Sequence, residues 1–262
     1  MPKPSSRTSV RRNAEKPASN APDVKVDPRP KRRLGLSGRL KIAANVILGV
    51  LAILAIIPII LTFVYAQPGV RPVSTLMAAQ WMSGEDIDRR WRDFDEISPF
   101  LWQSVMMSED GQFCSHDGVD WNQVNIVINS AVKGENVRGA STLPMQLAKN
   151  LFLWPSRSYL RKALEVPLAL LIDAVWTKRR IMEVYLNVAE WGDGIFGAEA
   201  AAQRHFGRSA ARLNRGQAAR LAVTLPNPHL RNPAKPSRGL QRLANRAERR
   251  GKASGAYIGC LR

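Results

Sequence analysis

The chain has 262 residues and a formal net charge of +18, a length that suffices for one sizeable globular domain and a tail. The excess charge lies at the two ends, because residues 1–41 carry twelve Lys and Arg, residues 204–262 carry fourteen, and residues 67–203 are slightly acidic. Without a basic stripe interleaved with aromatic residues in the middle of the chain, the composition disfavours a nucleic-acid-binding protein.

The first 66 residues form two contrasting parts. Residues 1–41 are rich in Pro, Ser, Lys and Arg, which predicts a disordered tail because too little apolar surface can be buried to offset the ordering entropy. Residues 42–66 contain no charged residue. At a rise of about 1.5 Å per residue they can span a hydrocarbon core of roughly 30 Å. They predict a transmembrane helix with a kink at Pro58. A buried core helix or a cleaved signal peptide fits the length of this segment less well.

The residues before this segment predict its orientation. Six basic residues crowd its N-terminal side: Arg29, Lys31, Arg32, Arg33, Arg39 and Lys41. Because positive side chains are retained on the cytoplasmic side, we expect a single-pass protein of the cell inner membrane. Its N-terminus would be cytoplasmic and the remainder of the chain periplasmic.

Beyond the span, the pattern predicts a mostly α protein. Pro68 and Pro72 indicate a linker over residues 67–97. Apolar residues at spacings of three and four predict helices at residues 98–110, 121–133, 158–176, 178–188, 197–206 and 215–224. A further helix is expected after Ser141 or Thr142, either of which can cap it, with Pro144 in its first turn.

The last part of the chain is predicted to contain little regular structure. Pro226, Pro228 and Pro233 are expected to end regular structure. We therefore assign residues 98–233 to the folded domain and residues 234–262 to a basic C-terminal segment that we expect to be peripheral.

Cys114 and Cys260 are the two cysteines of the chain. Two cysteines so far apart in the sequence make no disulfide framework. The pattern favours two free thiols, with a single bridge as the alternative in an oxidising compartment.

Two glutamates are the candidate reactive groups. Glu109 follows the apolar run Phe100 to Met107, and partial desolvation there would raise its pKa toward a value useful for a base. Glu165 follows Arg161 and Lys162 at helical spacings of four and three, so it lies on their side of a helix. Two carboxylates can divide acid, base and electrostatic roles in glycosyl transfer.

Basic residues gather between the two glutamates. Lys149, Arg157, Arg161 and Lys162 fall within fourteen residues. A diphosphate leaving group is already an anion, so it needs cations and hydrogen bonds rather than a proton. The cluster therefore indicates a phosphate-bearing leaving group. The alternative for such a run is a solvated helix face.

Five ordered blocks between about residues 100 and 233 carry a resemblance. They are Glu109-Asp110-x-x-Phe113-x-x-His116-x-Gly118, Gly139-Ala140-Ser141-Thr142 through Gln146-x-x-Lys149-Asn150, Arg161-Lys162-x-x-Glu165, Lys178-x-x-Ile181-x-Glu183-x-Tyr185-Leu186-Asn187, and Leu221-Ala222 with Leu225-Pro226-Asn227-Pro228. The chain resembles the family-51 glycosyltransferases, the peptidoglycan polymerases that use lipid II. Details at Leu151–Trp154 and Ala189–Gly194 resemble most the monofunctional branch, which lacks a transpeptidase domain.

The resemblance implies a lysozyme-like helical domain that joins lipid II units by β-1,4 transfer and releases undecaprenyl diphosphate. It implies Glu109 as base and an essential role for Glu165 near the donor phosphate. Substrate-binding residues would be Ser141, Thr142, Gln146, Lys149, Asn150, Arg157, Arg161 and Lys162, with Asp110, Phe113 and His116 in support. Ser141 and Thr142 serve either as a helix cap alone or as a cap that also donates to phosphate. Where family members usually carry a polar pair before the second-motif Gln, this chain has Pro144-Met145, which would remove substrate hydrogen bonds.

No cofactor is expected to be required, although a divalent cation could bind at the diphosphate. His116 has no second His or Cys at metal spacing, so we expect no zinc site. Expected partners are lipid II, the growing glycan chain and the inner membrane, with other cell-wall synthases or division proteins as further candidates. Two other functions stay open. A membrane-anchored lytic transglycosylase or muramidase would share the fold but expel a neutral sugar, and a non-enzymatic scaffold would bind cell-wall synthases.

Overall fold

The computed structural model describes residues 36–135, 139–156 and 158–262. By its internal contacts the chain divides into two compact units, residues 1–48 and residues 49–262. The predicted disordered tail lies, up to residue 35, outside the described residues.

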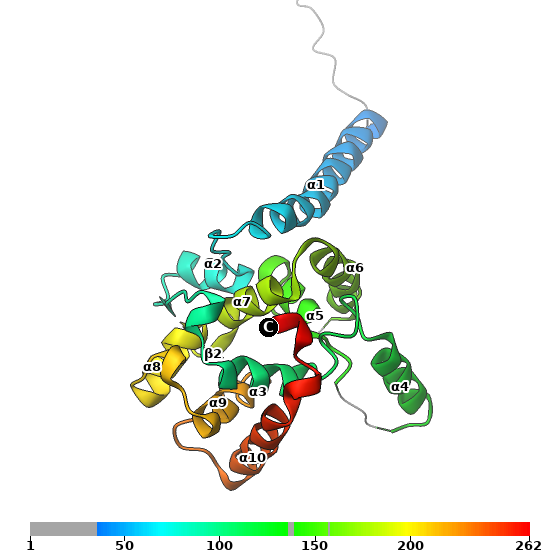
Figure 1. The fold of residues 1–262 in the computed structure, drawn as a ribbon. Coiled ribbons are helices and arrows are strands. Elements are labelled where there is room, and N and C mark those ends of the chain that lie inside the picture. The colour runs from blue at the N-terminus through cyan, green and yellow to red at the C-terminus, as the bar shows by residue number, and fades with distance from the viewer. Residues whose placement is uncertain (1–35, 136–138, 157) are drawn as a thin grey trace, which may run out of the picture. The chain divides into compact units, whose positions relative to one another are not determined.

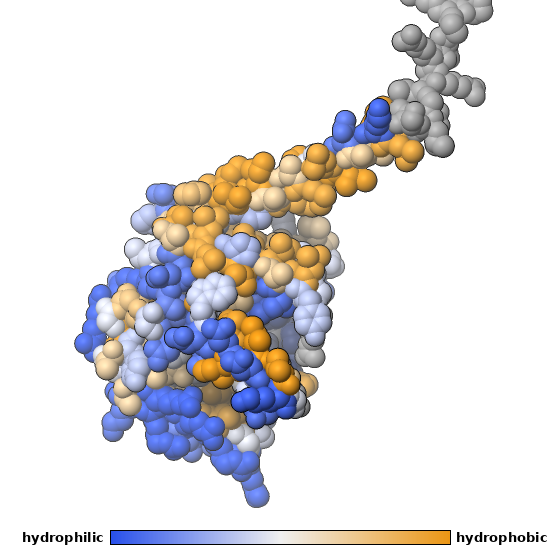
Figure 2. All heavy atoms as spheres, turned by 90° about the vertical axis from the view of Figure 1, so that its right-hand side faces the viewer, coloured by the Kyte–Doolittle hydropathy of each residue, from blue (hydrophilic) through white to orange (hydrophobic). Residues whose placement is uncertain are grey.

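The first element, α1 (Leu36–Tyr65), is a continuous helix with Pro58 inside it. Its stretch Leu40–Tyr65 is long and apolar enough to cross a membrane, and Figure 2 shows its apolar side chains in orange along the helix. Because a row of exposed Leu, Ile and Val side chains is unfavourable in water, this helix is consistent with a single N-terminal membrane anchor.

Residues 49–65 of α1 belong to the second unit and contact the helices that follow them in it. The Trp176 indole nitrogen donates to the Thr62 carbonyl at 2.7 Å, and Arg180 Nη2 donates to the Tyr65 carbonyl at 2.9 Å. The last turns of α1 thus provide carbonyl acceptors for the buried side chains of Trp176 and Arg180.

We expect these contacts to matter when the anchor is removed. A chain that begins at residue 58 keeps both carbonyl acceptors, whereas one that begins at residue 67 removes the acceptor of Trp176 and leaves Arg180 with Val70 and Glu183. Each lost hydrogen bond of this kind costs about 1–3 kcal/mol. Both truncated chains should leave the membrane fraction, and thermal unfolding should show the shorter one melting at least several degrees lower. Equal melting temperatures, or a full-length chain that is soluble without detergent, would contradict this.

Helices make up most of the second unit, together with a small three-stranded sheet (Figure 1). The helices are α2 (Thr75–Met82), α3 (Pro99–Glu109), α4 (Trp121–Val132), α5 (Leu143–Phe152), α6 (Tyr159–Val175), α7 (Lys178–Val188), α8 (Ala198–Phe206), α9 (Arg215–Ala222) and α10 (Arg238–Lys252). The mostly α prediction is confirmed, and α3 to α9 lie within two residues of their predicted positions. The sheet has the order β1 (Asp88–Arg89), β3 (Ile195–Phe196), β2 (Glu190–Gly192), with β1 parallel and β2 antiparallel to β3.

Local side chains explain where several helices begin. Thr142 accepts a hydrogen bond from the Met145 amide, Ser158 from the Arg161 amide and Thr177 from the Arg180 amide. Each satisfies an amide that has no partner inside its own helix. These caps fix the start of α5, α6 and α7, and α5 and α6 carry the predicted cations Lys149, Arg161 and Lys162.

The core lies around α7, on which all residues from Arg180 to Val188 except Glu183 are buried. α5 packs against α6 and α7, while α3 packs against α9 and α10. This arrangement brings the end of α3, which carries Glu109, beside α5, which carries Gln146. Packing around one central helix therefore unites segments that are distant in the sequence.

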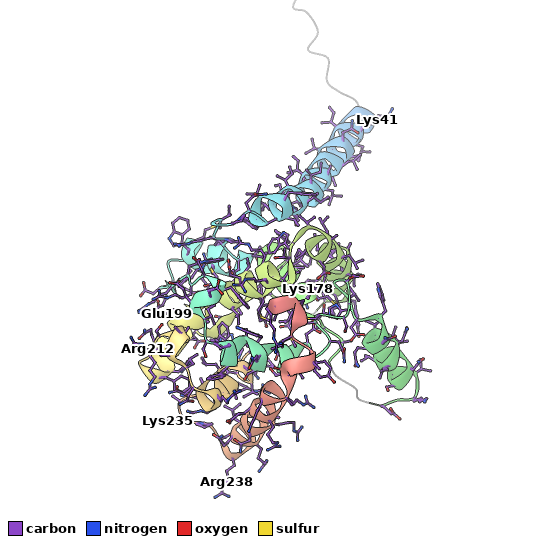
Figure 3. The ribbon with its side chains drawn as sticks, viewed as in Figure 1. Lys41, Lys178, Glu199, Arg212, Lys235 and Arg238 are labelled. Carbon is purple, nitrogen blue, oxygen red and sulfur yellow. A yellow bond between two sulfur atoms is a disulfide. The ribbon has the colours of Figure 1, made fainter. Side chains whose placement is uncertain are left out.

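The expectation of a peripheral C-terminal segment is wrong. α10 packs against α3 and α9 through Leu240, Ala244, Ala247 and Gly251, and Ile258 and Leu261 join the main core. Its apolar residues recur at spacings of four, three and four, a helical signal that the density of arginines obscures. Lys235 and Arg238, before and at the start of α10, point outward at the surface (Figure 3).

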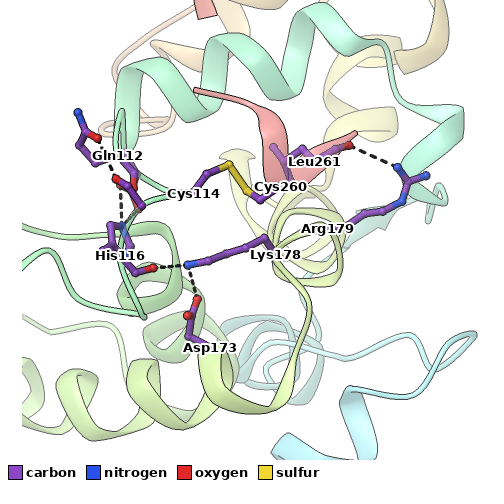
Figure 4. The surroundings of a disulfide bond; sticks show 10 residues. Gln112, Cys114, His116, Asp173, Lys178, Arg179, Cys260 and Leu261 are labelled. Atoms are coloured by element: carbon purple, nitrogen blue, oxygen red, sulfur yellow. Dashed lines mark hydrogen bonds and ion pairs between the residues drawn. A yellow bond between two sulfur atoms is a disulfide. The ribbon is translucent and has the colours of Figure 1, made fainter. Parts of the chain in front are cut away.

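The two cysteines form a disulfide, with their Cα atoms 5.5 Å apart. The favoured prediction of two free thiols is therefore wrong. The bridge ties the loop after α3 to the C-terminal segment, next to the side chain of Lys178 (Figure 4). Cysteines 146 residues apart meet here because α10 folds back along α3, which no local pattern indicates.

Candidate active site

Glu109, the last residue of α3, is held by a hydrogen-bond chain from the core. Its Oε2 accepts from Gln146 Nε2 at 3.0 Å, and Gln146 Oε1 accepts from the Tyr185 hydroxyl at 2.9 Å. Among the described residues, no cation lies within 4.0 Å of its carboxylate. Burial raises the pKa of Glu109, while the Gln146 hydrogen bond and the charges of Arg231 and Lys149 oppose the rise. Within the described ranges, Glu109 is thus an oriented carboxylate without an ion-pair partner.

The loop after Glu109 is braced by the other residues of the first motif. Asp110 accepts from the Leu143 amide at 2.8 Å and pairs with His116 Nε2 at 3.0 Å. Lys178 Nζ donates to the His116 carbonyl at 2.5 Å and lies 4.9 Å from the centre of the Phe113 ring. Asp110, Phe113 and His116 therefore join the end of α3 to the start of α5 and α7.

Gly118 and Thr142 close the same loop. Gly118 has a φ of +83°, and a Cβ there would lie 2.7 Å from the Ala169 carbonyl oxygen, so glycine is required. Thr142 Oγ1 donates to the Gly118 carbonyl at 2.6 Å and accepts from the Met145 amide. This hydroxyl is used inside the protein, which favours a cap alone for Thr142.

Glu165 is buried, with 2 % of its side chain exposed, and carries two ion pairs. Arg161 Nη1 and Lys162 Nζ both donate to it, the latter at 2.6 Å, and Lys162 Nζ also donates to Ser141 Oγ at 2.7 Å. The glutamate thus aligns two cations beside the Ser141 hydroxyl. Arg157 lies outside the described residues.

The cations of this cluster repel one another. Burial, then Arg161 and Lys149, lower the pKa of Lys162 to about 8. The pKa of Lys149 is lowered by burial and by Arg161, while Glu109 and Glu190 act in the opposite direction. Crowded, partly desolvated positive charges of this kind favour the binding of an anion, which would restore the pKa values of both lysines.

Two of the cavities are each lined by several of the predicted residues. The larger, of about 700 Å³, is lined by residues that include Gln146, Lys149, Asn150, Arg161 and Tyr185. The second, of about 480 Å³, is lined by residues that include Glu109, Asp110, Ser141 and Thr142. The hydrogen bond from Gln146 to Glu109 joins the linings of the two cavities. Candidate base and candidate cations therefore border adjacent spaces.

Sequence reasoning missed Glu190 and His229 on the wall of the larger cavity. Glu190 Oε1 accepts from Gln80 Nε2 at 3.4 Å, and burial raises its pKa. Glu190 belongs to β2. The sequence Glu190-Trp191-Gly192 is the signal that could have identified this residue, but only the fold brings it to the same cavity as Lys149. Met145, of the unusual Pro144-Met145 pair, is instead buried against Val119 and Ala169, away from both cavities.

Comparison with known proteins identifies the family of the chain. The family model described as Transglycosylase matches residues 75–252. The chain is 60 % identical over 220 residues to the biosynthetic peptidoglycan transglycosylase of Agrobacterium fabrum, covering 84 % of this chain and 97 % of that protein. It is 58 % identical over 217 residues to the protein of the same name from Brucella suis, covering 83 % and 97 %. The chain therefore belongs to the transglycosylase family, as a relative of the biosynthetic peptidoglycan transglycosylases.

Proposed function

We propose that this protein is a peptidoglycan glycosyltransferase that polymerises lipid II into β-1,4-linked glycan strands and releases undecaprenyl diphosphate. One observation carries the proposal. The partly buried Glu109 and the buried Glu165 have opposite surroundings, because Glu109 has no cation partner among the described residues and Glu165 aligns Arg161 and Lys162. A free base on one side and fixed cations on the other suit attack by a hydroxyl on a sugar that carries a diphosphate.

In this mechanism the acceptor 4-hydroxyl attacks the anomeric carbon of the donor. Glu109, oriented by Gln146, takes the hydroxyl proton as the new glycosidic bond forms. The bond from the anomeric carbon to the diphosphate oxygen breaks, and its electron pair leaves with the diphosphate. Lys149, Arg161 and Lys162 meet the charge that develops on that oxygen. Glu165 acts by positioning the cations rather than by taking a proton.

The surroundings of the glutamates also weigh against the other functions. A lytic transglycosylase expels a neutral sugar, which gains nothing from three cations and needs a proton from an acid. A scaffold without activity needs neither the free carboxylate nor the crowded cations. Incubation of the detergent-purified protein with labelled lipid II decides between them, since only the polymerase yields glycan strands.

We expect Lys149→Ala to lower turnover of lipid II by about 10- to 100-fold, because a charge-assisted contact to a growing anion contributes roughly 1.5–3 kcal/mol. Lys252→Ala, in the exposed last turn of α10, is the matched control and should stay within about twofold. Initial rates at low and high salt test this. Equal losses in both variants that vanish at high salt would indicate membrane attraction instead.

The orientation of the chain follows from two observations. The basic residues before α1 favour a cytoplasmic N-terminus, and the Cys114–Cys260 disulfide favours an oxidising compartment for the catalytic unit. We therefore propose a periplasmic catalytic unit anchored in the inner membrane. Protease added to spheroplasts should remove the catalytic unit and leave a tag on the N-terminus intact.

Further partners and a divalent cation remain proposals. Within the described part of the chain, no group of three or more His, Cys, Asp and Glu residues is arranged to hold a metal. A divalent cation at the diphosphate would therefore take most of its ligands from phosphate oxygens and water, as magnesium usually does. The growing glycan chain would share the site with lipid II, and other cell-wall synthases or division proteins are candidate partners.

A further inference from the structure

A third cavity also borders Glu109. It has a volume of about 260 Å³ and is lined by Ser108, Glu109, Val223, Pro226, Arg231, Leu243, Arg246, Ala247 and Arg250. Three of these side chains are arginines, and we call this cavity the arginine pocket. Arg250 also lines the second cavity with Glu109 and Ser141, so the arginine pocket lies beside the proposed reaction centre.

The three arginines have no acidic partner within the described ranges. No carboxylate lies within 4.0 Å of Arg231, Arg246 or Arg250. Arg231 is anchored by a hydrogen bond from Nη1 to the Val223 carbonyl at 2.6 Å, and its charge acts on Glu109. An uncompensated group of guanidinium ions in one concave space is suited to binding an oxyanion, because each can donate two parallel hydrogen bonds.

The packing of α10 holds this pocket in place. Gly251 allows close approach to α3, since a Cβ there would lie 3.3 Å from Ser104 Oγ, and Ala247 is buried. Arg246 and Arg250 are one turn apart on the same helix, so they project to the same side. Arg246 and Arg250 are therefore held on a helix that packs against α3, while Val223, Pro226 and Arg231 come from the segment after α9.

We propose that the arginine pocket binds a carboxylate of the peptide carried by the acceptor. This rests on the proposed function, in which the acceptor hydroxyl must lie against Glu109. The cations around Glu165 are assigned to the diphosphate of the donor. The last turns of α1 contact Trp176 and Arg180, whereas α10 packs on α3 and α9 at the opposite end of the unit (Figure 1). The pocket thus lies away from the membrane end, where the acceptor's own lipid diphosphate would be.

The test uses full-length protein in detergent with two substrates, lipid II and an analogue that has the same disaccharide and lipid diphosphate but no peptide. Arg246→Ala and Arg250→Ala are compared with Arg242→Ala, an exposed arginine on the same helix outside the pocket lining. We expect the two pocket variants to raise KM for lipid II about tenfold each, with kcat within twofold. With the peptide-free analogue, wild type and variants should have the same KM. Arg250→Lys should restore part of the loss.

Three results would overturn the proposal. An equal rise of KM with both substrates would indicate a phosphate contact or attraction to the detergent-lipid surface. A rise no larger than that of Arg242→Ala would indicate an effect of overall positive charge. An unchanged KM would show that the pocket does not bind the substrate. Thermal unfolding of each variant shows whether it is folded. If wild type forms no polymer from lipid II, the proposed function fails, which is distinct from failure of the subsite.

Discussion

Glu109→Gln is expected to abolish polymerisation while the fold stays intact. The amide keeps the size of the carboxylate and can still bond to Gln146, but it cannot accept the proton of the acceptor hydroxyl. Loss of a general base typically costs about 10²–10⁴-fold in rate. Single-turnover assays with labelled lipid II give this factor, and a melting temperature near that of wild type establishes that the variant is folded.

The pH dependence of the rate provides a second test of Glu109 as the general base. Burial raises the pKa of Glu109, so its basic, deprotonated form is present above that pKa and is lost as pH falls through it. The polymerisation rate of wild type should therefore rise with increasing pH on the acid side of the profile. The apparent pKa of this rise should lie above the ordinary value of a carboxyl group. In Glu109→Gln the residual rate should lack this limb. A folded variant with wild-type rate, or with an unchanged acid limb, would show that another group is the base.

Replacing both cysteines, Cys114→Ser with Cys260→Ser, is expected to cost about 4–5 kcal/mol of stability. The bridge closes a segment with a sequence separation of 146 residues, and the chain-entropy account gives stabilisation of this size for long loops. For a unit of this length each kcal/mol shifts the melting temperature by roughly 2–4 °C. The double variant should therefore melt roughly 10–20 °C below wild type under oxidising conditions.

Reduction of the wild-type protein provides the control. A reductant should lower the melting temperature of wild type toward that of the double variant and leave the double variant unchanged. Below its melting temperature the variant should also lose activity, because the bridge ties the loop that carries Asp110 and His116 to the C-terminal segment. If the double variant, reduced wild type and oxidised wild type all had the same melting temperature, the bridge would contribute nothing to stability.

Much of the architecture follows from local patterns in the sequence. The uncharged stretch 42–66 predicts α1, the cap at Ser141 or Thr142 predicts α5, and apolar spacings of three and four predict helices such as α6 and α7, because helix formation depends on neighbours three and four residues away. The residues around Glu109 and around Glu165 were likewise found from their order along the chain.

Only the tertiary structure decided which of these segments meet. Gln146 bonds to Glu109, Cys114 to Cys260, and Arg246 and Arg250 line a cavity with Glu109, across separations of 37 to 146 residues. Such contacts arise when apolar faces are buried together, so they depend on the packing of α3, α5, α7 and α10 and leave no periodic mark in the sequence. The arginines of α10 illustrate this, since their charge alone predicts a solvated segment, and burial of Leu240, Ala244 and Ala247 beneath them brings two of them to the cavity that Glu109 also lines.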